Sequence, residues 1–595
     1  MVNLKINNKN ISCKESSTII EAAKENNILI PNLCYLEDIH KIGSCRMCVV
    51  EVEGEKNLQA SCMVPVKEGM VVKTNTQRVK RARKVVYELM LSDHPSDCLS
   101  CGRNQNCEFQ ELGEMLKVDE SRFEGEVSKP FLDESSPSIV RDVSKCILCR
   151  RCVTICNEVQ ELGIINPQNR GFKTEIGPAL ELPLNTVNCS NCGQCTIVCP
   201  VGALYEKDAT KPVWDAIFND KKRVIIQTAP AIRAALGEEF GYEPGTSVTG
   251  KMVSALRDMG FDDVFDTNFA ADLTIIEEGY EFLGRVKNAL TGKDSVLPMI
   301  TSCSPGWIKY VEHDFPEALD HISSCKSPHM MLGALAKTYY PENKGINPED
   351  LFVVSVMPCT AKKFEISRPE MMNNGLQNVD AVLTTRELAS MIKEAGIDFK
   401  TLPENKFDDP LGLSTGAADI FATTGGVMEA ALRTVYEVVT GREVPFDKLR
   451  VEPIRGLEKI KTADIKIENP LEDYKVLDGV TVKVAVTSGL SGAKQLMKEI
   501  SEGNSPYHFI EIMGCPGGCI SGGGQPRSSE KDTVNKRIQA IWREDEGKKY
   551  RKSHENPAIK KIYEDYLDKP LGHKSHELLH TKYTKRGVFN EYIKK

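Results

Sequence analysis

The sequence predicts a multidomain α+β protein in which small cysteine-rich domains precede a larger α/β domain. The chain has 595 residues, more than one hydrophobic core usually serves, so several domains are expected. Most of its 21 cysteines lie in closely spaced groups before residue 200. After about residue 213, short apolar runs are separated by longer segments, which is typical of α/β domains.

The composition favours a metal-binding protein of a reducing compartment. The formal net charge is -8 without a long basic run, which disfavours nucleic acid as the main partner. Residues 1–10 are polar, unlike a signal peptide, and we expect no membrane span because no segment is long and apolar enough. We therefore expect a cytoplasmic protein, in which so many cysteines indicate metal ligation rather than disulfides.

Two cysteine runs between residues 146 and 199 predict two [4Fe-4S] clusters. The spacing Cys-x2-Cys-x2-Cys-x3-Cys occurs twice, and Pro200 follows the second run. In such a doubled run the first three thiolates bind one cluster, and the fourth binds the cluster of the other run. Two-residue spacings also suit zinc, but the doubled pattern disfavours zinc and disulfides. The two predicted ligand sets are Cys146, Cys149, Cys152 and Cys199, and Cys156, Cys189, Cys192 and Cys195.

The N-terminal segment predicts a small β-rich domain with a [2Fe-2S] cluster. Residues 2–6 alternate as a strand does, and residues 18–25 have a helical pattern that Ser16 or Ser17 could cap. Gly43 suits a loop whose backbone passes close to cluster sulfurs. The first cysteine spacer is longer than in the plant-type pattern, which leaves another ligand open. The predicted cluster ligands are Cys34, Cys45, Cys48 and Cys62.

A basic stretch at residues 76–88 is predicted to be helical and leads to a third group of ligands. This group has the pattern His94-x3-Cys98-x2-Cys101-x5-Cys107. Three cysteines leave a [4Fe-4S] cluster one ligand short, and imidazole is a competent ligand for iron. A solvated or capping histidine is the alternative, but the ligand count favours His94 as a ligand.

Together these motifs resemble the N-terminal half of multi-cluster [FeFe] hydrogenases. A similar half occurs in electron-transfer subunits of NADH dehydrogenase and formate dehydrogenase. The resemblance implies a β-grasp [2Fe-2S] ferredoxin-like domain at 1–77, a small His/Cys cluster domain at 78–120 and a two-[4Fe-4S] ferredoxin domain at 137–210. This half therefore indicates an electron relay, and the remaining residues must identify where the relay ends.

Five apolar runs predict the strands of the C-terminal α/β domain, at residues 224–228, 297–301, 352–356, 482–487 and 509–513. Three of them lead into cysteine-bearing segments at 301–307, 357–363 and 514–519. Strand ends in α/β sheets carry ligand sites, so these cysteines can converge on one crevice. The alternatives are buried free thiols and a phosphate-binding loop at 521–525, but no Gly-Lys-Ser/Thr sequence follows those glycines.

The three cysteine segments resemble those of the [FeFe] hydrogenase catalytic domain, and the likeness runs from about residue 230 to 580 within a predicted domain at 213–595. The resemblance implies an H-cluster, in which a cysteine sulfur joins a [4Fe-4S] cubane to a two-iron site carrying CO, cyanide and a bridging dithiolate with an amine. It implies cubane ligation by Cys359, Cys515 and Cys519, with Cys519 as the bridge. It also implies that Lys362 binds a cyanide, that Met357 and Met513 form apolar walls, and that the other side is lined by Pro230, Ala231 and the backbone after Gly425.

One position departs from that family, which usually has two adjacent cysteines where this chain has Cys303 and Ser304. In the family the first cysteine relays protons and the second ligates the cubane. A serine alkoxide is a harder ligand than a thiolate and is harder to deprotonate. The fourth ligand is therefore open between Ser304, Cys303 and Cys325, with the first two ranked above Cys325.

The resemblance also implies a proton path from the dithiolate amine through Cys303 to Glu278, Ser323 and Glu281, with Arg285 near the surface. Glu278 and Glu281 are three residues apart and share a face if the segment is helical. Buried carboxyl groups with raised pKa values can pass protons, whereas a solvated acidic helix face would not.

Three histidines near the C-terminus offer another metal site. His573, His576 and His580 would share one face of a predicted helix and could bind zinc. No carboxylate pattern accompanies them, so we expect a packing helix that closes the catalytic domain.

These observations predict a cytoplasmic enzyme that reversibly makes or consumes H2. Electrons would pass between the H-cluster and ferredoxin through one [2Fe-2S] and three [4Fe-4S] clusters, and maturation proteins would build the two-iron site. Alternatively, the chain is the H2-activating subunit of an NAD(H)-linked or electron-bifurcating complex, whose flavin and NADH would bind other subunits because no dinucleotide fingerprint is visible here. An electron-transfer subunit, an H2 sensor and an iron–sulfur assembly protein are lesser alternatives.

Overall fold

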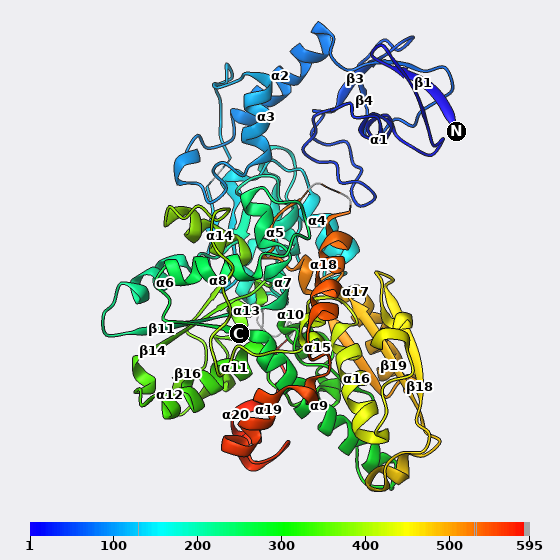
Figure 1. The fold of residues 1–595 in the computed structure, drawn as a ribbon. Coiled ribbons are helices and arrows are strands. Elements are labelled where there is room, and N and C mark those ends of the chain that lie inside the picture. Colours follow the sequence, from blue (N-terminus) through cyan, green and yellow to red (C-terminus); the bar gives the residue numbers. More distant parts are fainter. Residues whose placement is uncertain (129, 529, 531, 588–595) are drawn as a thin grey trace. The chain divides into compact units, whose positions relative to one another are not determined.

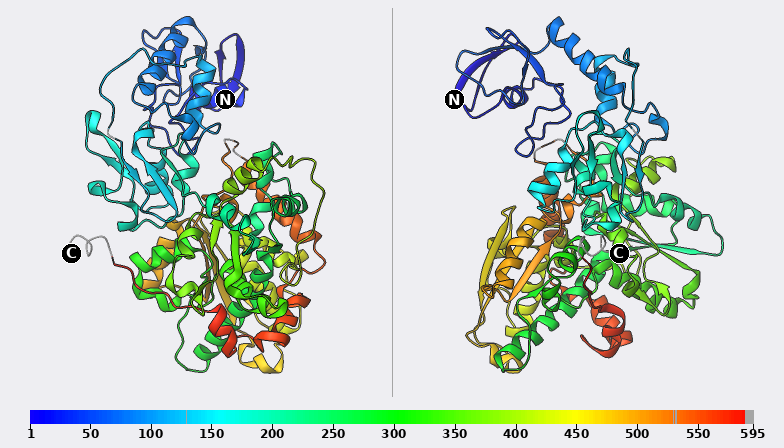
Figure 2. Two further views of the ribbon diagram at one scale, coloured as in Figure 1. Left: turned by 90° about the vertical axis from the view of Figure 1, so that its left-hand side faces the viewer. Right: turned by 180° about the vertical axis from the view of Figure 1, so that it is seen from behind.

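The computed structural model describes residues 1–128, 130–528, 530 and 532–587 (Figures 1 and 2). The chain forms two compact units. The N-terminal unit comprises Met1–Val187 and Gln194–Tyr205, and the C-terminal unit comprises Asn188–Gly193 and the chain from Glu206 onward. The described part contains no helix that is both long and apolar enough to cross a membrane.

The N-terminal unit begins with a five-stranded sheet in the order β2-β1-β5-β3-β4. Strand β1 pairs antiparallel with β2 and parallel with the central strand β5. Helix α1 (Ile19–Glu25) packs its apolar side against this sheet. The predicted strand and helix are both present, but the helix is capped by Thr18 rather than by Ser16 or Ser17, and the Thr18 N–H donates to Glu21 at 2.7 Å. The strands are β1 (Val2–Ile6), β2 (Lys9–Cys13), β3 (Val49–Val52), β4 (Gln59–Ala60) and β5 (Val71–Lys73).

The predicted basic helix is α2 (Gln77–Leu91), which begins where the Val79 N–H donates to the Thr76 hydroxyl at 3.2 Å. One face of α2 holds buried side chains at four-residue spacing. On this face Arg83 donates to the carbonyl oxygens of Met47 and Val49 at 3.1 and 2.9 Å. The rest of the unit includes α3 (Glu108–Leu116), a hairpin of β6 (Leu132–Asp133) and β7 (Ile139–Asp142), α4 (Arg151–Thr154) and α5 (Gln194–Val198).

The C-terminal unit is built on two four-stranded sheets, in the orders β12-β11-β14-β17 and β13-β20-β19-β18. The first sheet is wholly parallel, and in the second only the edge strand β18 is antiparallel. All five predicted strands are present, although β13 is shorter than expected. The strands are β11 (Arg223–Thr228), β12 (Asp263–Asp266), β13 (Met299–Ile300), β14 (Leu351–Val356), β17 (Ala381–Leu383), β18 (Ile460–Lys466), β19 (Thr481–Ser488) and β20 (Phe509–Met513).

Helix α9 (Thr267–Leu290) joins the hydrophobic cores of the two sheets. Phe269 and Leu273 pack in the core around the first sheet, whereas Ile275 and Phe282 pack in the core around the second. At 1.5 Å per residue the helix spans roughly 36 Å, long enough to serve both cores. It also packs against α11 (Pro328–Lys337) and α16 (Gly426–Thr440). Because α9 holds the two sheets together, it fixes where their strand ends meet.

Candidate functional site

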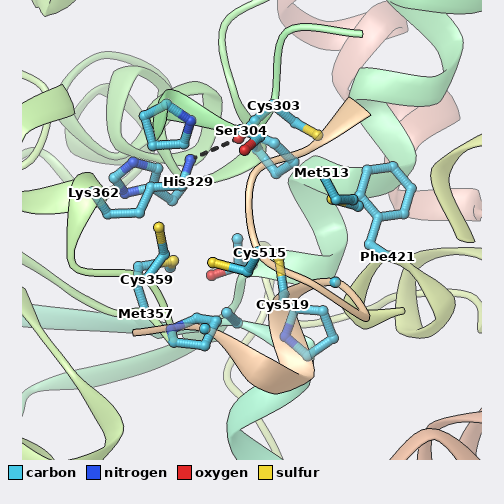
Figure 3. Close-up of a pocket in the computed structure, with 18 of the residues that line it drawn as sticks. Cys303, Ser304, His329, Met357, Cys359, Lys362, Phe421, Met513, Cys515 and Cys519 are labelled. Atoms are coloured by element: carbon cyan, nitrogen blue, oxygen red, sulfur yellow. Dashed lines mark hydrogen bonds between the residues drawn. The ribbon is translucent and has the colours of Figure 1, made fainter. Parts of the chain in front are cut away.

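A cavity of about 80 Å³ lies among the segments that follow β11, β13, β14 and β20 (Figure 3). A single water needs only about 10–15 Å³ by this measure, so the cavity has room for a group of several atoms. The three cysteine segments predicted to converge do converge here. The cavity is lined by Cys303, Ser304, Cys359, Cys515 and Cys519, together with Pro230, Met357, Lys362, Phe421 and Met513.

The cavity thiols suit an iron–sulfur group. The thiols of Cys359 and Cys515 are hydrogen-bonded to each other, which lowers the pKa of Cys359 and raises that of Cys515. Burial raises the pKa of Cys519 to about 12. Three sulfurs in an apolar cavity are the soft donors that iron–sulfur clusters take, so the residues present fit such a group.

The three candidates for a fourth ligand occupy different places. The Ser304 oxygen accepts a hydrogen bond from the N–H of Gly514 at 3.0 Å, next to Cys515. The sulfur of Cys303 points toward Met513 rather than toward Cys359 and Cys515 (Figure 3). Cys325 is not among the described residues that line the cavity, and it instead forms a β-bridge with His580. Ser304 therefore lies on the Cys515 side of the cavity, and Cys303 lies on the apolar wall.

Lys362 is held at the cavity by two hydrogen bonds. Its ammonium group donates to the Cys303 carbonyl oxygen at 3.1 Å (Figure 3) and to Glu365 at 2.7 Å. Glu365 also lies 2.7 Å from Nε2 of His329. Burial opposes ionisation of Glu365, but Lys362 and His329 lower its pKa to about 2. The ionised carboxylate keeps a cation fixed beside the cavity.

Two of the predicted cofactor-binding residues, Ala231 and Gly425, are not among the described residues that line the cavity. Gly425 has a φ of 87°, which suits glycine, and its N–H donates to Glu511 at 2.6 Å. Glu511 also accepts from the N–H of Met428 at 2.7 Å, so a carboxylate on β20 fixes the N-terminus of α16. The Ala231 carbonyl accepts from the Gln525 side chain at 3.1 Å. Gly425 and Ala231 thus hold segments in place, whereas Pro230 lines the cavity.

The predicted proton-path residues form a connected line on one side of α9. Glu278 is 2% exposed, and burial raises its pKa to about 8 although the Ser323 hydroxyl donates to it. The Ser323 oxygen lies 3.3 Å from Glu281, which pairs with Arg285 at 2.7 Å. These residues thus connect the Glu278 carboxyl group, which is protonated at neutral pH, with the half-buried ion pair of Glu281 and Arg285.

The cysteines of the N-terminal unit form two further groups that fit iron–sulfur clusters. Cys34 hydrogen-bonds with Cys45, which lowers the pKa of Cys34 to about 5, and the sulfurs of Cys48 and Cys62 are 3.4 Å apart. A second cavity is lined by the first predicted set, Cys146, Cys149, Cys152 and Cys199. The other set is divided between the units, with Cys156 and Cys195 in the N-terminal unit and Cys189 and Cys192 in the C-terminal unit.

The His94 group lies in the segment between α2 and α3. The His94 ring packs against Phe109, with 5.0 Å between ring centroids, and burial lowers its pKa. The imidazole is therefore neutral, which is the form that ligates metals. Cys98 is exposed, Cys101 is half-buried, and Cys107 is buried directly before α3.

Sequence reasoning missed that the Cys189–Cys192 segment lies on the cavity loops. The Thr360 hydroxyl donates to the Asn191 carbonyl at 2.8 Å, and the Cys192 carbonyl lies 4.0 Å from the Cys515 sulfur. A Cβ at Gly523 would lie 2.5 Å from that carbonyl, so only glycine fits. The glycines at 522–524 therefore allow two backbone segments to approach each other closely. This run of glycines was the sequence signal that could have indicated the contact.

The prediction that His573, His576 and His580 share one face of a helix is wrong. Helix α20 (His573–Leu579) ends before His580, whose ring nitrogens lie 2.8 Å from the Ser324 oxygen and 3.1 Å from Glu277. Glu277 on α9 supplies a carboxylate that the sequence did not indicate. His580 instead comes close to Glu281 and Cys325.

Matches to known protein families cover nearly the whole chain. Residues 222–523 match the C-terminal domain of the iron-only hydrogenase large subunit, and residues 531–586 match the iron hydrogenase small subunit. Residues 1–77 match a 2Fe-2S iron-sulfur cluster binding domain, and residues 83–122 match the NADH-ubiquinone oxidoreductase-G iron-sulfur binding region. Residues 145–203 match a 4Fe-4S dicluster domain. The chain thus carries iron–sulfur cluster-binding domains ahead of a hydrogenase domain.

Individual relatives agree with these matches. The chain is 52% identical to the NADP-reducing hydrogenase subunit HndD of Solidesulfovibrio fructosivorans and 41% identical to iron hydrogenase 1 of Clostridium pasteurianum, each over 98% of this chain and 99% of the relative. A solved variant of apo [FeFe]-hydrogenase HydA1 from Chlamydomonas reinhardtii is 43% identical, with a TM-score of 0.58 over 64% of this chain and 99% of that chain. The chain therefore belongs to the iron-only, or [FeFe], hydrogenase family and is an oxidoreductase acting on H2.

Proposed function

We propose that this chain catalyses the reversible conversion of H2 into two protons and two electrons and exchanges the electrons with ferredoxin. The observation that carries the proposal is the convergence of Cys303, Cys359, Cys515, Cys519 and Lys362 on one apolar cavity. Soft sulfur ligands, a fixed cation and a mostly apolar lining suit a low-valent iron site.

The cavity residues would hold the H-cluster. Cys359, Cys515, Cys519 and Ser304 would ligate its cubane, and Lys362 would donate to a cyanide of the two-iron site. When bound, this group supplies the two-electron chemistry that divides H2 into protons and electrons. The apolar side chains of Met357, Met513 and Phe421 keep water from the cavity, which strengthens the interaction of Lys362 with a bound anion.

The cysteine groups that precede Glu206 would hold the accessory clusters. Cys34, Cys45, Cys48 and Cys62 would bind one [2Fe-2S] cluster. The remaining predicted ligands would bind three [4Fe-4S] clusters, one of them through His94, Cys98, Cys101 and Cys107. Support comes from the paired buried thiols, the shared cavity of the first doubled-run set and the neutral His94.

Protons would move between Cys303 and the surface through α9. Glu278 holds a proton at neutral pH, the Ser323 hydroxyl bridges it to Glu281, and Arg285 holds Glu281 near solvent. A hydroxyl that lies between two carboxyl groups can accept from one and donate to the other, so protons can pass in either direction.

A second candidate is the H2-activating subunit of a complex that uses a nicotinamide cofactor, with flavin and dinucleotide on other subunits. The observation that favours it is the 52% identity to an NADP-reducing hydrogenase subunit over nearly the full chain. Copurification with a flavin-containing chain, and NAD(P) reduction by H2 only in its presence, would favour the complex. For either candidate we propose a cytoplasmic location, because 21 cysteines in a reducing compartment would serve as metal ligands rather than form disulfides. We also propose dependence on maturation proteins.

The proposed function is tested by infrared spectroscopy of the anaerobically purified, co-matured protein, with and without H2. CO and cyanide stretching bands that shift under H2 are the expected result. A protein with its full iron content but no such bands would overturn the proposal.

Replacing Glu278 by glutamine (Glu278→Gln) is expected to lower viologen-linked H2 turnover by about 10²–10⁴-fold. The amide keeps the size of the side chain but cannot exchange a proton, and general acid–base groups contribute on this scale. The infrared bands should be unchanged, because Glu278 holds no cluster. Glu502→Gln, an exposed carboxylate at the end of α17 (Leu490–Ser501), serves as control and should keep full turnover.

Replacing Ser304 distinguishes the fourth cubane ligand. If the Ser304 oxygen is the ligand, Ser304→Cys should keep the cubane and its electron paramagnetic resonance signal, because thiolate is the softer ligand. Ser304→Ala should lose about one four-iron cluster per chain. An unchanged iron content in Ser304→Ala, together with cluster loss in Cys303→Ala, would assign the ligand to Cys303 instead.

A further inference from the structure

The exposed face of α2 carries positive charge that the proposed chemistry has not used. Val79, Arg83 and Tyr87 form its buried stripe, and Glu88 is buried beside them. At 100° per residue Arg81 lies nearly opposite the centre of this stripe, and Lys84 and Lys80 lie about 100° and about 60° from it. These three cations are exposed, and no ion pair joins any of them to a described residue. Together with Gln77, Val85 and the ion-paired Glu88 and Arg122, they line an open groove.

The buried face of α2 contacts two groups of predicted cluster ligands. Arg83 donates to the carbonyls on either side of Cys48, and the Tyr87 hydroxyl donates to the Phe109 carbonyl, two residues beyond Cys107. A helix is about 10 Å across with its side chains, so a protein bound on the basic face would lie about one helix diameter from either group.

We propose that the basic face of α2, formed by Lys80, Arg81 and Lys84, is the docking site of a small acidic iron–sulfur protein that exchanges electrons with this chain. The proposal rests on the proposed electron relay. Unpaired cations around a groove attract an acidic partner and speed its encounter, and this attraction weakens with salt. The position of α2 gives that partner access to the relay, which a solvated charged face elsewhere would not.

The test uses Lys80→Gln/Arg81→Gln/Lys84→Gln in the full holoenzyme, with H2 as donor and an acidic bacterial 2[4Fe-4S] ferredoxin as acceptor. The matched control is Lys287→Gln/Lys498→Gln/Lys561→Gln, which removes the same charge from exposed helix positions of the C-terminal unit. We expect KM for ferredoxin to rise about tenfold at low salt and its salt dependence to flatten in the first variant only, with viologen-linked turnover unchanged.

Equal KM values in the two variants would overturn the docking site, as would a change in oligomeric state confined to the first variant, which would indicate a second copy as the partner. Failure of the proposed function would appear differently, as absence of viologen-linked H2 turnover in the unaltered enzyme.

An independent set of contacts concerns His580. The Ser324 hydroxyl lies between the Glu281 carboxylate, at 2.9 Å, and Nδ1 of His580, at 2.8 Å. Nε2 of His580 lies 3.1 Å from Glu277. Glu277 also accepts from the Tyr563 hydroxyl at 2.5 Å, and its lowered pKa keeps it ionised despite burial, so Nε2 carries a proton.

The single hydroxyl proton of Ser324 therefore has two positions. When Nδ1 is unprotonated, the Ser324 hydroxyl donates to Nδ1 and no longer donates to Glu281. When Nδ1 carries a proton, the Ser324 oxygen accepts from His580 and its hydroxyl donates to Glu281. The ring of His576, which is exposed, lies 4.5 Å from the His580 ring between centroids. Cys325 also faces His580, and Arg285 faces Glu281.

We propose that His580 is a second proton branch, which joins the Glu281 end of the proposed path to Glu277. A proton leaves the Glu281 carboxyl for the Ser324 oxygen, the O–H bond of Ser324 breaks as its original proton binds Nδ1 of His580, and the Nε2–H bond breaks as that proton passes to the Glu277 carboxylate. Uptake follows the same bonds in reverse, and no other reactant is needed.

The test compares Ser324→Ala, Ser324→Thr and His580→Gln in viologen-linked H2 oxidation, with His573→Gln as the matched exposed control on α20. Ser324→Ala and His580→Gln should lower kcat about threefold to tenfold and raise the solvent deuterium isotope effect, whereas Ser324→Thr, which keeps the hydroxyl, should restore both. Iron content and infrared bands should stay unchanged in all variants.

A kcat and isotope effect in Ser324→Ala equal to those of the unaltered enzyme would overturn the branch. So would an equal loss in Ser324→Thr, which would show a packing role. Absence of the CO and cyanide infrared bands from the unaltered enzyme would instead contradict the proposed function itself.

Discussion

The packing of α9 into two hydrophobic cores is the constraint on which the C-terminal unit depends. Strand ends from two separate sheets can face one cavity only if the sheets are held at a fixed distance, and α9 contributes side chains to both cores. The same helix presents Glu278 and Glu281 toward the segments after β13. One helix thus fixes the cavity and carries the proposed proton path beside it, so the two cannot shift independently.

Near the cavity, Lys362 is fixed as a cation and the carboxyl group of Glu278 is kept neutral. Lys362 is compensated by Glu365, which His329 also contacts, so the cation is buried without being unpaired. Glu278 lacks such a cation, and burial raises its pKa. Because an unpaired buried charge is costly, the carboxyl group keeps its proton and becomes a donor. Two buried acids of the C-terminal unit, Glu365 and Glu278, therefore have opposite protonation states for a local physical reason.

Local patterns predicted the strands, the basic helix and the cysteine groups because each depends on residues close in sequence. Apolar runs predicted five of the eight strands in the two main sheets of the C-terminal unit, and cysteine spacing predicted the set of four that lines one cavity. Tertiary contacts could not be predicted in this way. The Thr18 cap, the Cys192 carbonyl beside Cys515 and the turn of His580 away from α20 each depend on a partner distant in sequence or on one hydrogen bond at a helix end.

The serine at position 304 illustrates how a local departure acts through its surroundings. Its oxygen accepts a hydrogen bond from the Gly514 N–H, and a hydrogen bond to an oxygen anion stabilises the charged form. A serine that must bind iron as an alkoxide therefore needs such donors more than a cysteine would, since its hydroxyl is much harder to deprotonate. The adjacent Cys303 faces apolar side chains and lacks this stabilisation, and burial raises the pKa of its thiol. The two neighbours thus differ in the direction expected if the oxygen binds the cluster and the thiol retains a proton.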